Sequence, residues 1–395
     1  MKSLRKKILA SALIVTLVGG VFAPKASAAD PETDKQIWKD LKITKILNKV
    51  EKGVTTPDVN FEFKFEPITK GAPNIDKVTT IPFKAADNSD ADGTEQGVQV
   101  EKTGNVDLSG IQWTEAGIYE YKLYEVIPDT PMKDMDYGYY LHGGNYIKQR
   151  VKAEYCYHVI FKVKKVGDQF NITDIVVKTY RGGKIQKKMD YDSIKGVKFK
   201  NYYDKKDGNT PQPGGGTDIT EDDKKGFAFK KTVVTKHPED NDKPFEFTVK
   251  VDKAVGSNSK DTEFKYVVVD KDGNVGGEQT AAYGTGFIVN LKHNERVVFT
   301  DVILGSKVSV EETNTQELTP SVEGTLLEAQ KGDKNITGII GDNNGGNFAE
   351  ITNTNDDTPL TGVLIDNLPY IALVVVAGLG IFFFVKNRRE EEIYA

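Results

Sequence analysis

The chain of 395 residues carries 53 Lys and Arg against 58 Asp and Glu, a formal net charge of -5, 38% hydrophobic positions, four His and one Cys. One Cys excludes a disulfide scaffold, the few His leave little scope for a metal centre, and the acidic balance argues against nucleic-acid binding. The composition therefore predicts a globular protein of two or three domains, with no metal or other cofactor and no nucleic-acid partner.

The first 28 residues have the pattern of a secretory signal peptide. Basic residues at positions 2, 5, 6 and 7 precede an apolar run over 8–23, and the small residues Ala26 and Ala28 follow. We expect cleavage after Ala28, so that the rest of the chain is secreted.

Residues 34–203 are predicted to form an N-terminal β-sandwich domain. Apolar and polar side chains alternate, as at Phe61, Phe63 and Phe65 and again over 119–123 and 157–163. A period of two is typical of strands with one buried face. Because no long apolar stretch at helical spacing interrupts this pattern, the fold class is predicted to be all-β with Ig-like sandwich sheets.

A polar stretch, residues 204–224, separates this domain from a second one. It contains two Pro and three consecutive Gly with almost no apolar side chain, so we expect a linker that adds nothing to a core. Residues 225–355 return to alternation, for example at Phe245, Phe247 and Val249. They are predicted to form a second β-sandwich domain in tandem with the first.

Both halves contain the same three residue types in the same order. Each has a Lys on its first predicted strand, a Glu 80 residues later and an Asn on its last predicted strand. These residues are Lys45, Glu125 and Asn201 in the first half and Lys231, Glu311 and Asn353 in the second. The equal spacing of Lys and Glu indicates a duplicated functional pattern.

Three features follow the second domain. The pentapeptide 358–362 consists of Thr358, Pro359, Leu360, Thr361 and Gly362. An uncharged apolar segment, 368–385, is long enough to cross ~30 Å of hydrocarbon as a helix. The tail 386–395 begins with basic residues, so it is expected in the cytoplasm, with everything before the apolar segment outside.

In this order, the pentapeptide, apolar segment and basic tail resemble the sorting signal of Gram-positive surface proteins, which sortase cleaves and joins to an amine. The usual pentapeptide is Leu-Pro-any-Thr-Gly, and Thr358 stands here in place of Leu. The two domains resemble the two-domain backbone pilins of streptococci. Their most specific match is Tyr121-any-Leu123-any-Glu125, which is similar to the start of the pilin E-box.

That resemblance implies self-formed isopeptide bonds between Lys and Asn in each domain. In the N-terminal domain Glu125 would promote a bond between Lys45 and Asn201, and in the C-terminal domain Glu311 would promote a bond between the corresponding residues. This is single-turnover self-modification, and the protein is not expected to be an enzyme.

The chemistry of the residues agrees with such a bond. An inward Lys on a first strand is a buried charge that costs several kcal/mol unless it is paired. Burial lowers an amine pKa and raises a carboxyl pKa, so a neutral amine can lie beside a protonated acid and attack a carboxamide. If the strands slip by an odd step, the inward residue is instead a neighbouring lysine. The lysines concerned are Lys42, Lys200 and Lys230.

The resemblance also implies polymerisation. Sortase would join Thr361 of one subunit to a lysine of the next, giving a head-to-tail fibre on the cell wall with minor pilins as further partners and a host surface as a possible target. The acceptor predicted from the family pattern is Lys195, with Lys184, Lys187 and Lys188 as competitors.

Two functions besides a structural shaft subunit are conceivable for such a chain. A monomeric wall-anchored adhesin would use similar domains as a stalk, whereas a secreted hydrolase would need a nucleophile elbow, metal motif or carboxylate pair that the sequence lacks. Residues 88–93 match only the first half of a calcium loop. Cys156, within an alternating segment, is expected to be a buried thiol.

Overall fold

The computed structural model describes residues 37–76, 79–87, 98–142, 145–148, 155–181, 184–189, 196–342 and 346–355. The expected signal peptide 1–28, Lys195, the pentapeptide 358–362, the apolar segment 368–385 and the tail 386–395 lie outside these residues. Within them, no helix combines the length and apolar character needed to cross a membrane.

The N-terminal domain is built from strands in two sheets. The strands are β1 (Asp40–Lys49), β2 (Val59–Pro67), β3 (Thr79–Phe83), β4 (Val98–Asp107), β5 (Gly117–Val126), β6 (Met135–His142), β7 (Asn145–Lys148), β8 (Tyr155–Val166), β9 (Gln169–Arg181), β10 (Lys184–Met189) and β11 (Val197–Tyr203). One sheet has the order β4-β1-β11-β6-β7 and the other β10-β9-β8-β5-β2-β3. Phe63 and Tyr157 of the second sheet contact Phe199 of the first, with ring centroids 4.9 and 5.1 Å away, so the sheets pack face to face.

The C-terminal domain repeats this architecture. Its elements are β12 (Lys206–Asp207), the 3-10 helix η1 (Asp223–Lys225), β13 (Ala228–Val234), the 3-10 helix η2 (Pro238–Asp242), β14 (Phe245–Asp252), β15 (Glu263–Val269), β16 (Gln279–Ala282), β17 (Gly286–Leu291), β18 (Arg296–Ile303), β19 (Lys307–Asn314), β20 (Thr319–Thr325), β21 (Leu327–Lys331), β22 (Asn335–Ile339) and β23 (Phe348–Thr354). The sheets are β16-β15-β18-β13-β23-β20 and β17-β14-β19-β22-β21. The predicted all-β fold with two tandem sandwiches is confirmed, because alternating apolar residues face each core.

The first and last strands of each domain are parallel neighbours. β1 pairs with β11, so that Lys45 lies opposite Phe199 and Asn201 is two residues further along. β13 pairs with β23 in the same way, with Lys231 opposite Ile351. Because side chains two residues apart on a strand share a face, the Lys and Asn of each domain point into the same core.

The stretch 204–224, which was expected to be a linker that adds nothing to a core, packs against the C-terminal domain. β12 pairs with β18 through Lys206 and Asp207. Asp223 is fully buried, accepts a hydrogen bond from Asn209 at 2.7 Å and lies 3.3 Å from Arg296. Besides these polar contacts, Ile219 packs against a second buried apolar cluster of this domain, so the stretch contributes to a core where none was expected.

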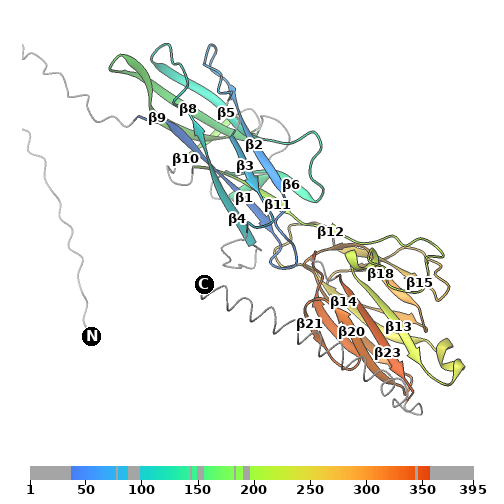
Figure 1. The fold of residues 1–395 in the computed structure, drawn as a ribbon. Helices are drawn as coiled ribbons and strands as arrows, with labels where there is room; N and C mark the ends of the chain where they lie inside the picture. The colour runs from blue at the N-terminus through green and yellow to red at the C-terminus, as the bar shows by residue number, and fades with distance from the viewer. Residues whose placement is uncertain are drawn as a thin grey trace, which may run out of the picture.

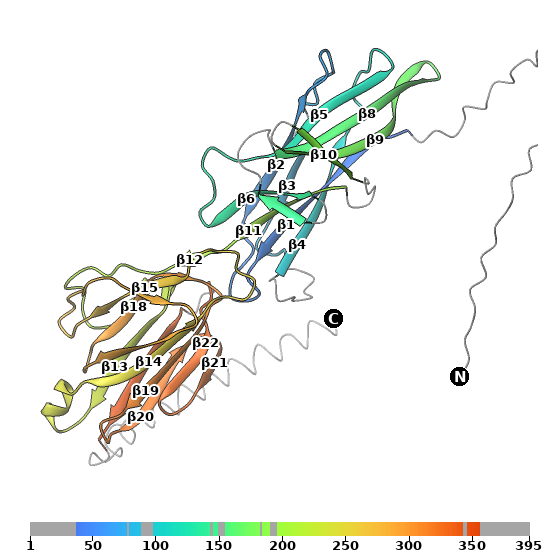
Figure 2. The same cartoon turned by 180° about the vertical axis from the view of Figure 1, so that it is seen from behind.

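The two domains lie end to end (Figures 1 and 2), and β1 and β11 both run toward the junction. The Glu51 N–H donates to the Val255 carbonyl at 3.0 Å. Asp342 accepts from the Thr55 N–H at 2.9 Å, and its own N–H donates to the Gly53 carbonyl at 2.8 Å. The junction is therefore a set of direct contacts and not only a covalent connection.

Candidate functional site

The structure brings Lys45, Glu125 and Asn201 together inside the N-terminal domain. Lys45 Nζ donates to Glu125 Oε2 at 2.6 Å, and Asn201 Nδ2 donates to Glu125 Oε1 at 2.6 Å. All three residues are buried, with 0%, 3% and 0% of their surface exposed. The acid therefore bridges the amine and the carboxamide, each through a different oxygen.

Three strands position this N-terminal site. Lys45 comes from β1 and Asn201 from the neighbouring β11, whereas Glu125 comes from β5 in the facing sheet. Tyr121, Leu123 and Glu125 alternate inward along β5. The acid therefore crosses the sandwich to reach the pair.

Burial of Lys45 shifts its amine toward the neutral form. Its Nζ lies 4.3 Å from the centroid of the Phe61 ring. Burial lowers the pKa of Lys45 to about 8, although Glu125 favours its charged form. Desolvation thus outweighs the attraction of the nearby carboxylate, so near neutral pH a larger fraction of this amine is in the neutral, nucleophilic form than for an exposed lysine.

The Asn201 carboxamide has a second partner that sequence reasoning missed. The backbone N–H of Gly138 on β6 donates to Asn201 Oδ1 at 3.0 Å. With a donor at the oxygen and an acceptor at the nitrogen, the orientation of the amide is fixed. A backbone donor carries no side-chain signal, so only the folded chain reveals it.

The C-terminal domain contains a matching cluster of Lys231, Glu312 and Asn353. Lys231 Nζ donates to Glu312 Oε1 at 2.9 Å, and Asn353 Nδ2 donates to the same oxygen at 2.7 Å. All three residues are fully buried. Burial lowers the pKa of Lys231 to about 8, and burial also raises the pKa of Glu312.

Glu311, the acid predicted for this site, is not part of it. Its side chain is about half exposed and lies 3.3 Å from Lys334. Val308, Val310 and Glu312 are the inward positions of β19. The correct signal was this alternation, which repeats the inward Tyr121, Leu123 and Glu125 of β5, whereas the equal spacing of 80 residues pointed one position too early.

The alternative lysines do not occupy the sites. Lys42, Lys200 and Lys230 lie an odd number of residues from the inward Lys45, Asn201 and Lys231, and therefore on the opposite faces of their strands. Lys230 pairs with Asp218 at 2.9 Å, and Lys200 lies over the Tyr202 ring. The register that turns Lys45 and Lys231 inward is the one the chain adopts.

Of the proposed acceptor lysines, the structure places the competitors only. Lys184 and Lys188 are exposed on the edge strand β10, which also contains Lys187. Cys156 is a buried free thiol, as expected, and burial raises its pKa to about 12. The described ranges contain no group of three or more His, Cys, Asp or Glu arranged to hold a metal.

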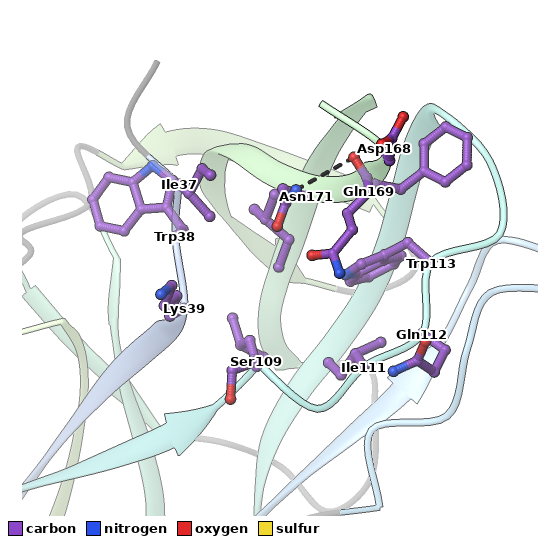
Figure 3. A pocket seen from close by; sticks show the side chains of 13 residues that line it. Ile37, Trp38, Lys39, Ser109, Ile111, Gln112, Trp113, Asp168, Gln169 and Asn171 are labelled. Atoms are coloured by element: carbon purple, nitrogen blue, oxygen red, sulfur yellow. Dashed lines mark hydrogen bonds between the residues drawn. The ribbon is translucent and has the colours of Figure 1, made fainter. Parts of the chain in front are cut away.

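A separate cavity of about 430 Å³ lies at the end of the N-terminal domain away from the junction, where β1 begins. Both tryptophans of the chain, Trp38 and Trp113, line it together with Phe170. Figure 3 shows Trp38 and Trp113 at two sides of the cavity with the Asn171 side chain between them. The cavity thus combines aromatic rings with amide groups.

A family model described as a domain of unknown function (DUF7601) matches residues 217–355, which include the whole C-terminal domain and the end of the preceding stretch. No curated protein matches the chain. Similar solved structures include the major pilin from Streptococcus pyogenes, at 20% identity over 80% of this chain and 98% of that one, with a TM-score of 0.34. Another is the T-13 major pilin from Streptococcus pyogenes, at 16% identity over 81% and 98%, with a TM-score of 0.32. A third is an adhesin from Mobiluncus mulieris that contains disulfide, isopeptide and ester cross-links, at 14% identity over 77% and 86%, with a TM-score of 0.19.

Proposed function

We propose that this chain is the shaft subunit of a covalent cell-surface fibre, a pilus, and that each domain cross-links itself by a Lys–Asn isopeptide bond. The observation that carries the proposal is the duplicated buried cluster of Lys, Glu and Asn across the parallel first and last strands. Two buried lysines beside acids are costly as ordinary core residues. Bond formation gives them a function.

The proposed reaction needs no group from outside the domain. The neutral Lys Nζ attacks Cγ of the Asn side chain and forms a new C–N bond. The acid takes the proton released from Nζ and delivers a proton to Nδ2, the old C–N bond breaks, and ammonia leaves. Proximity accelerates the reaction, because the strands hold the reacting groups beside each other before the bond forms.

The position of the proposed bonds suits a subunit under tension. β13 begins at the junction between the domains, and β23 runs parallel to β13 toward the opposite end of the C-terminal domain. There the Asn355 N–H donates a hydrogen bond to the Val234 carbonyl. Tension that enters at β13 and leaves after β23 would pass through the Lys231–Asn353 bond. The residues between them would then remain folded under load.

Assembly follows from the expected sorting signal. Sortase would cleave after Thr361 and join its carbonyl to Lys195 or a competing lysine of the next subunit, forming a head-to-tail filament. In this proposal the filament is anchored to the cell wall, carries minor pilins as further subunits and attaches to a host surface.

Intact-mass measurement of the recombinant chain tests the self-cross-linking. Each bond releases one ammonia, so we expect a mass about 17 Da below the sequence value for each domain, about 34 Da in total. Replacing Lys45 or Lys231 by Ala should restore about 17 Da each. A mass equal to the sequence value would contradict the proposal.

A second candidate function is ligand binding by a monomeric wall-anchored adhesin. The observation that favours it is the cavity lined by Trp38, Trp113 and Phe170 at the free end of the N-terminal domain. Concave sites with aromatic rings and a few polar groups are typical of ligand pockets. Immunoblots of cell-wall extracts separate the two functions: a ladder of high-mass species indicates a polymerised shaft, and a single band indicates the adhesin.

A further inference from the structure

The two buried sites differ in how the carboxamide oxygen is held. In the N-terminal site, Asn201 Oδ1 accepts a hydrogen bond from the Gly138 N–H at 3.0 Å. In the C-terminal site, Asn353 Oδ1 is buried and has no hydrogen-bond partner within the described part of the chain. The acid of the C-terminal site also makes hydrogen bonds through one oxygen only, because Glu312 Oε2 has no partner among the described residues.

A β-bulge creates the donor in the N-terminal site. In the ladder between β6 and β11, Lys200 pairs with Tyr139, whereas Tyr202 pairs with Asp136. Two residues of β6, Tyr137 and Gly138, are therefore left opposite Asn201. Gly138 has a φ of 87°, which favours glycine, and its N–H is turned from the ladder toward the side chain of Asn201.

The equivalent strand of the C-terminal domain cannot supply such a donor at this register. β20 lies beside β23 as β6 lies beside β11. Their ladder is regular and places Pro320 opposite Asn353. Proline has no backbone N–H. The Asn353 side chain is held only at its nitrogen, which donates to Glu312 Oε1 and, at 3.2 Å, to the Thr315 carbonyl.

This difference affects the atom on which charge develops. When Lys Nζ attacks Cγ, the electron pair of the carbonyl moves onto Oδ1, which becomes an oxyanion until the C–N bond to Nδ2 breaks. A preorganised N–H at that oxygen stabilises the transition state. The proton path differs as well, because Glu125 faces Nζ and Nδ2 with separate oxygens, whereas Glu312 faces both groups with Oε1.

We infer that the Gly138 N–H is the oxyanion donor of the N-terminal site, and that the C-terminal site, which lacks such a donor, forms its bond more slowly. This inference rests on the proposed self-cross-linking. It makes Gly138 a catalytic group, since its N–H touches a reacting atom. It also implies an order of maturation in which the N-terminal domain becomes covalently closed first.

The first experiment compares the two rates in one chain. The full-length protein is recovered uncross-linked from inclusion bodies in denaturant, refolded by dilution and quenched at intervals, and each cross-linked peptide is quantified by mass spectrometry. We expect the N-terminal bond to form roughly 100-fold faster, the effect of one oxyanion donor. Lys45→Ala and Lys231→Ala variants assign each loss of ammonia to its site.

Equal rates, or a faster C-terminal bond, would overturn the inference and leave the proposed self-cross-linking intact. Absence of both bonds in the folded protein would overturn the proposed function as well. Circular dichroism at each interval establishes whether the chain has folded before the bonds are counted.

The second experiment removes the Gly138 N–H itself. Cell-free translation with a suppressor tRNA charged with glycolic acid replaces the amide N–H at position 138 by an ester oxygen. The N-terminal bond should then form about 100-fold more slowly, while the C-terminal bond of the same chain keeps its rate and serves as the internal control. The same ester at Gly71, where the glycine has open space around it, controls for the backbone change. An unchanged rate at the N-terminal site contradicts the inference.

Discussion

Lys45 and Lys231 are fully buried, each with its amine near an aromatic ring and hydrogen-bonded to an acid. A buried ion pair is weak evidence for stability, because the loss of hydration offsets the attraction between the charges. In the C-terminal site, a neutral Lys231 amine beside a protonated Glu312 avoids most of that cost, and burial shifts both pKa values in that direction. The same proton distribution is the one required for attack on the carboxamide.

The choice between two adjacent acids gives a sharp test at the residue scale. Glu312→Ala should abolish the loss of about 17 Da in the C-terminal domain, because it removes the group that transfers the proton. Glu311→Ala is the matched control and should keep that loss, since Glu311 lies outside the site and pairs with Lys334. Intact mass distinguishes the two variants. The opposite pattern would restore Glu311 as the acid.

The rate of bond formation should also depend on pH in the C-terminal site. The reactive form of the pair, a neutral amine beside a protonated acid, holds one proton in total. Above pH about 8, where Lys231 loses its proton while Glu312 is ionised, the pair holds no proton, so the rate of bond formation should fall. It should fall again in acid, below the pKa of Glu312, which burial raises above its ordinary value of 4.5. Refolding at a series of pH values, with mass spectrometry after quenching, gives the profile. A rate that keeps rising above pH 8 would mean that the ionised carboxylate acts alone.

At the scale of elements, the parallel pairing of first and last strands is what makes a single bond effective. The loops closed by the proposed bonds run from residue 45 to 201 and from 231 to 353. On a chain-entropy model, loops of this length stabilise the folded state by about 5 kcal/mol each by restricting the unfolded chain. The bonds join strands that already share a ladder, so closure needs no rearrangement of the sheet.

A cut between β13 and β23 tests whether these strands are joined. A protease site inserted in the exposed segment 276–278, between β15 and β16, separates Lys231 from Asn353 along the chain. After cleavage and full denaturation, the two pieces should still migrate as one species on a denaturing gel. With Lys231→Ala they should separate. Separation in the unmodified protein would show that no bond joins the strands.

At the scale of the whole molecule, close backbone approach sets the junction between the domains. A Cβ on Gly305 would lie 2.6 Å from the Lys52 carbonyl and 2.8 Å from a methyl group of Val50. A Cβ on Gly53 would lie 2.9 Å from the Ile340 carbonyl. Both glycines also have positive φ. The domains therefore meet where side chains are absent, which leaves little room for sliding.

Substitution at Gly305 tests this rigidity. Gly305→Ala should push the domains apart and broaden the distance distribution measured by small-angle X-ray scattering, because the added carbon overlaps the Lys52 carbonyl. Gly284→Ala is the matched control: its φ is 78°, close to the 88° of Gly305, but nothing lies within 4 Å of its added carbon. Both variants carry about 1–2 kcal/mol of backbone strain. Equal scattering from the two variants would contradict a glycine-dependent junction.

The sequence by itself determined the all-β class and the two-domain order, because the period of two in a strand records which side chains face the core. The repeated order of Lys, Glu and Asn singled out Lys45, Glu125, Asn201, Lys231 and Asn353, but the alternative lysines at odd steps stayed open until the strands were assembled. The period of two identifies Glu312, and the error at Glu311 came from relying on equal spacing between repeats whose loops differ.

Only the tertiary structure decided how the polar stretch 204–224 and the junction are arranged, and which backbone groups lie opposite the Asn side chain in each site. The stretch 204–224 lies on the C-terminal domain because a buried Asp223 meets Arg296, a contact between residues far apart in sequence. The Gly138 donor depends on a bulge in the ladder beside Asn201, whereas Pro320 occupies the matching place in the other domain. Backbone hydrogen bonds and strand pairing across the chain leave no pattern in the local sequence, so they become visible only when the strands are assembled.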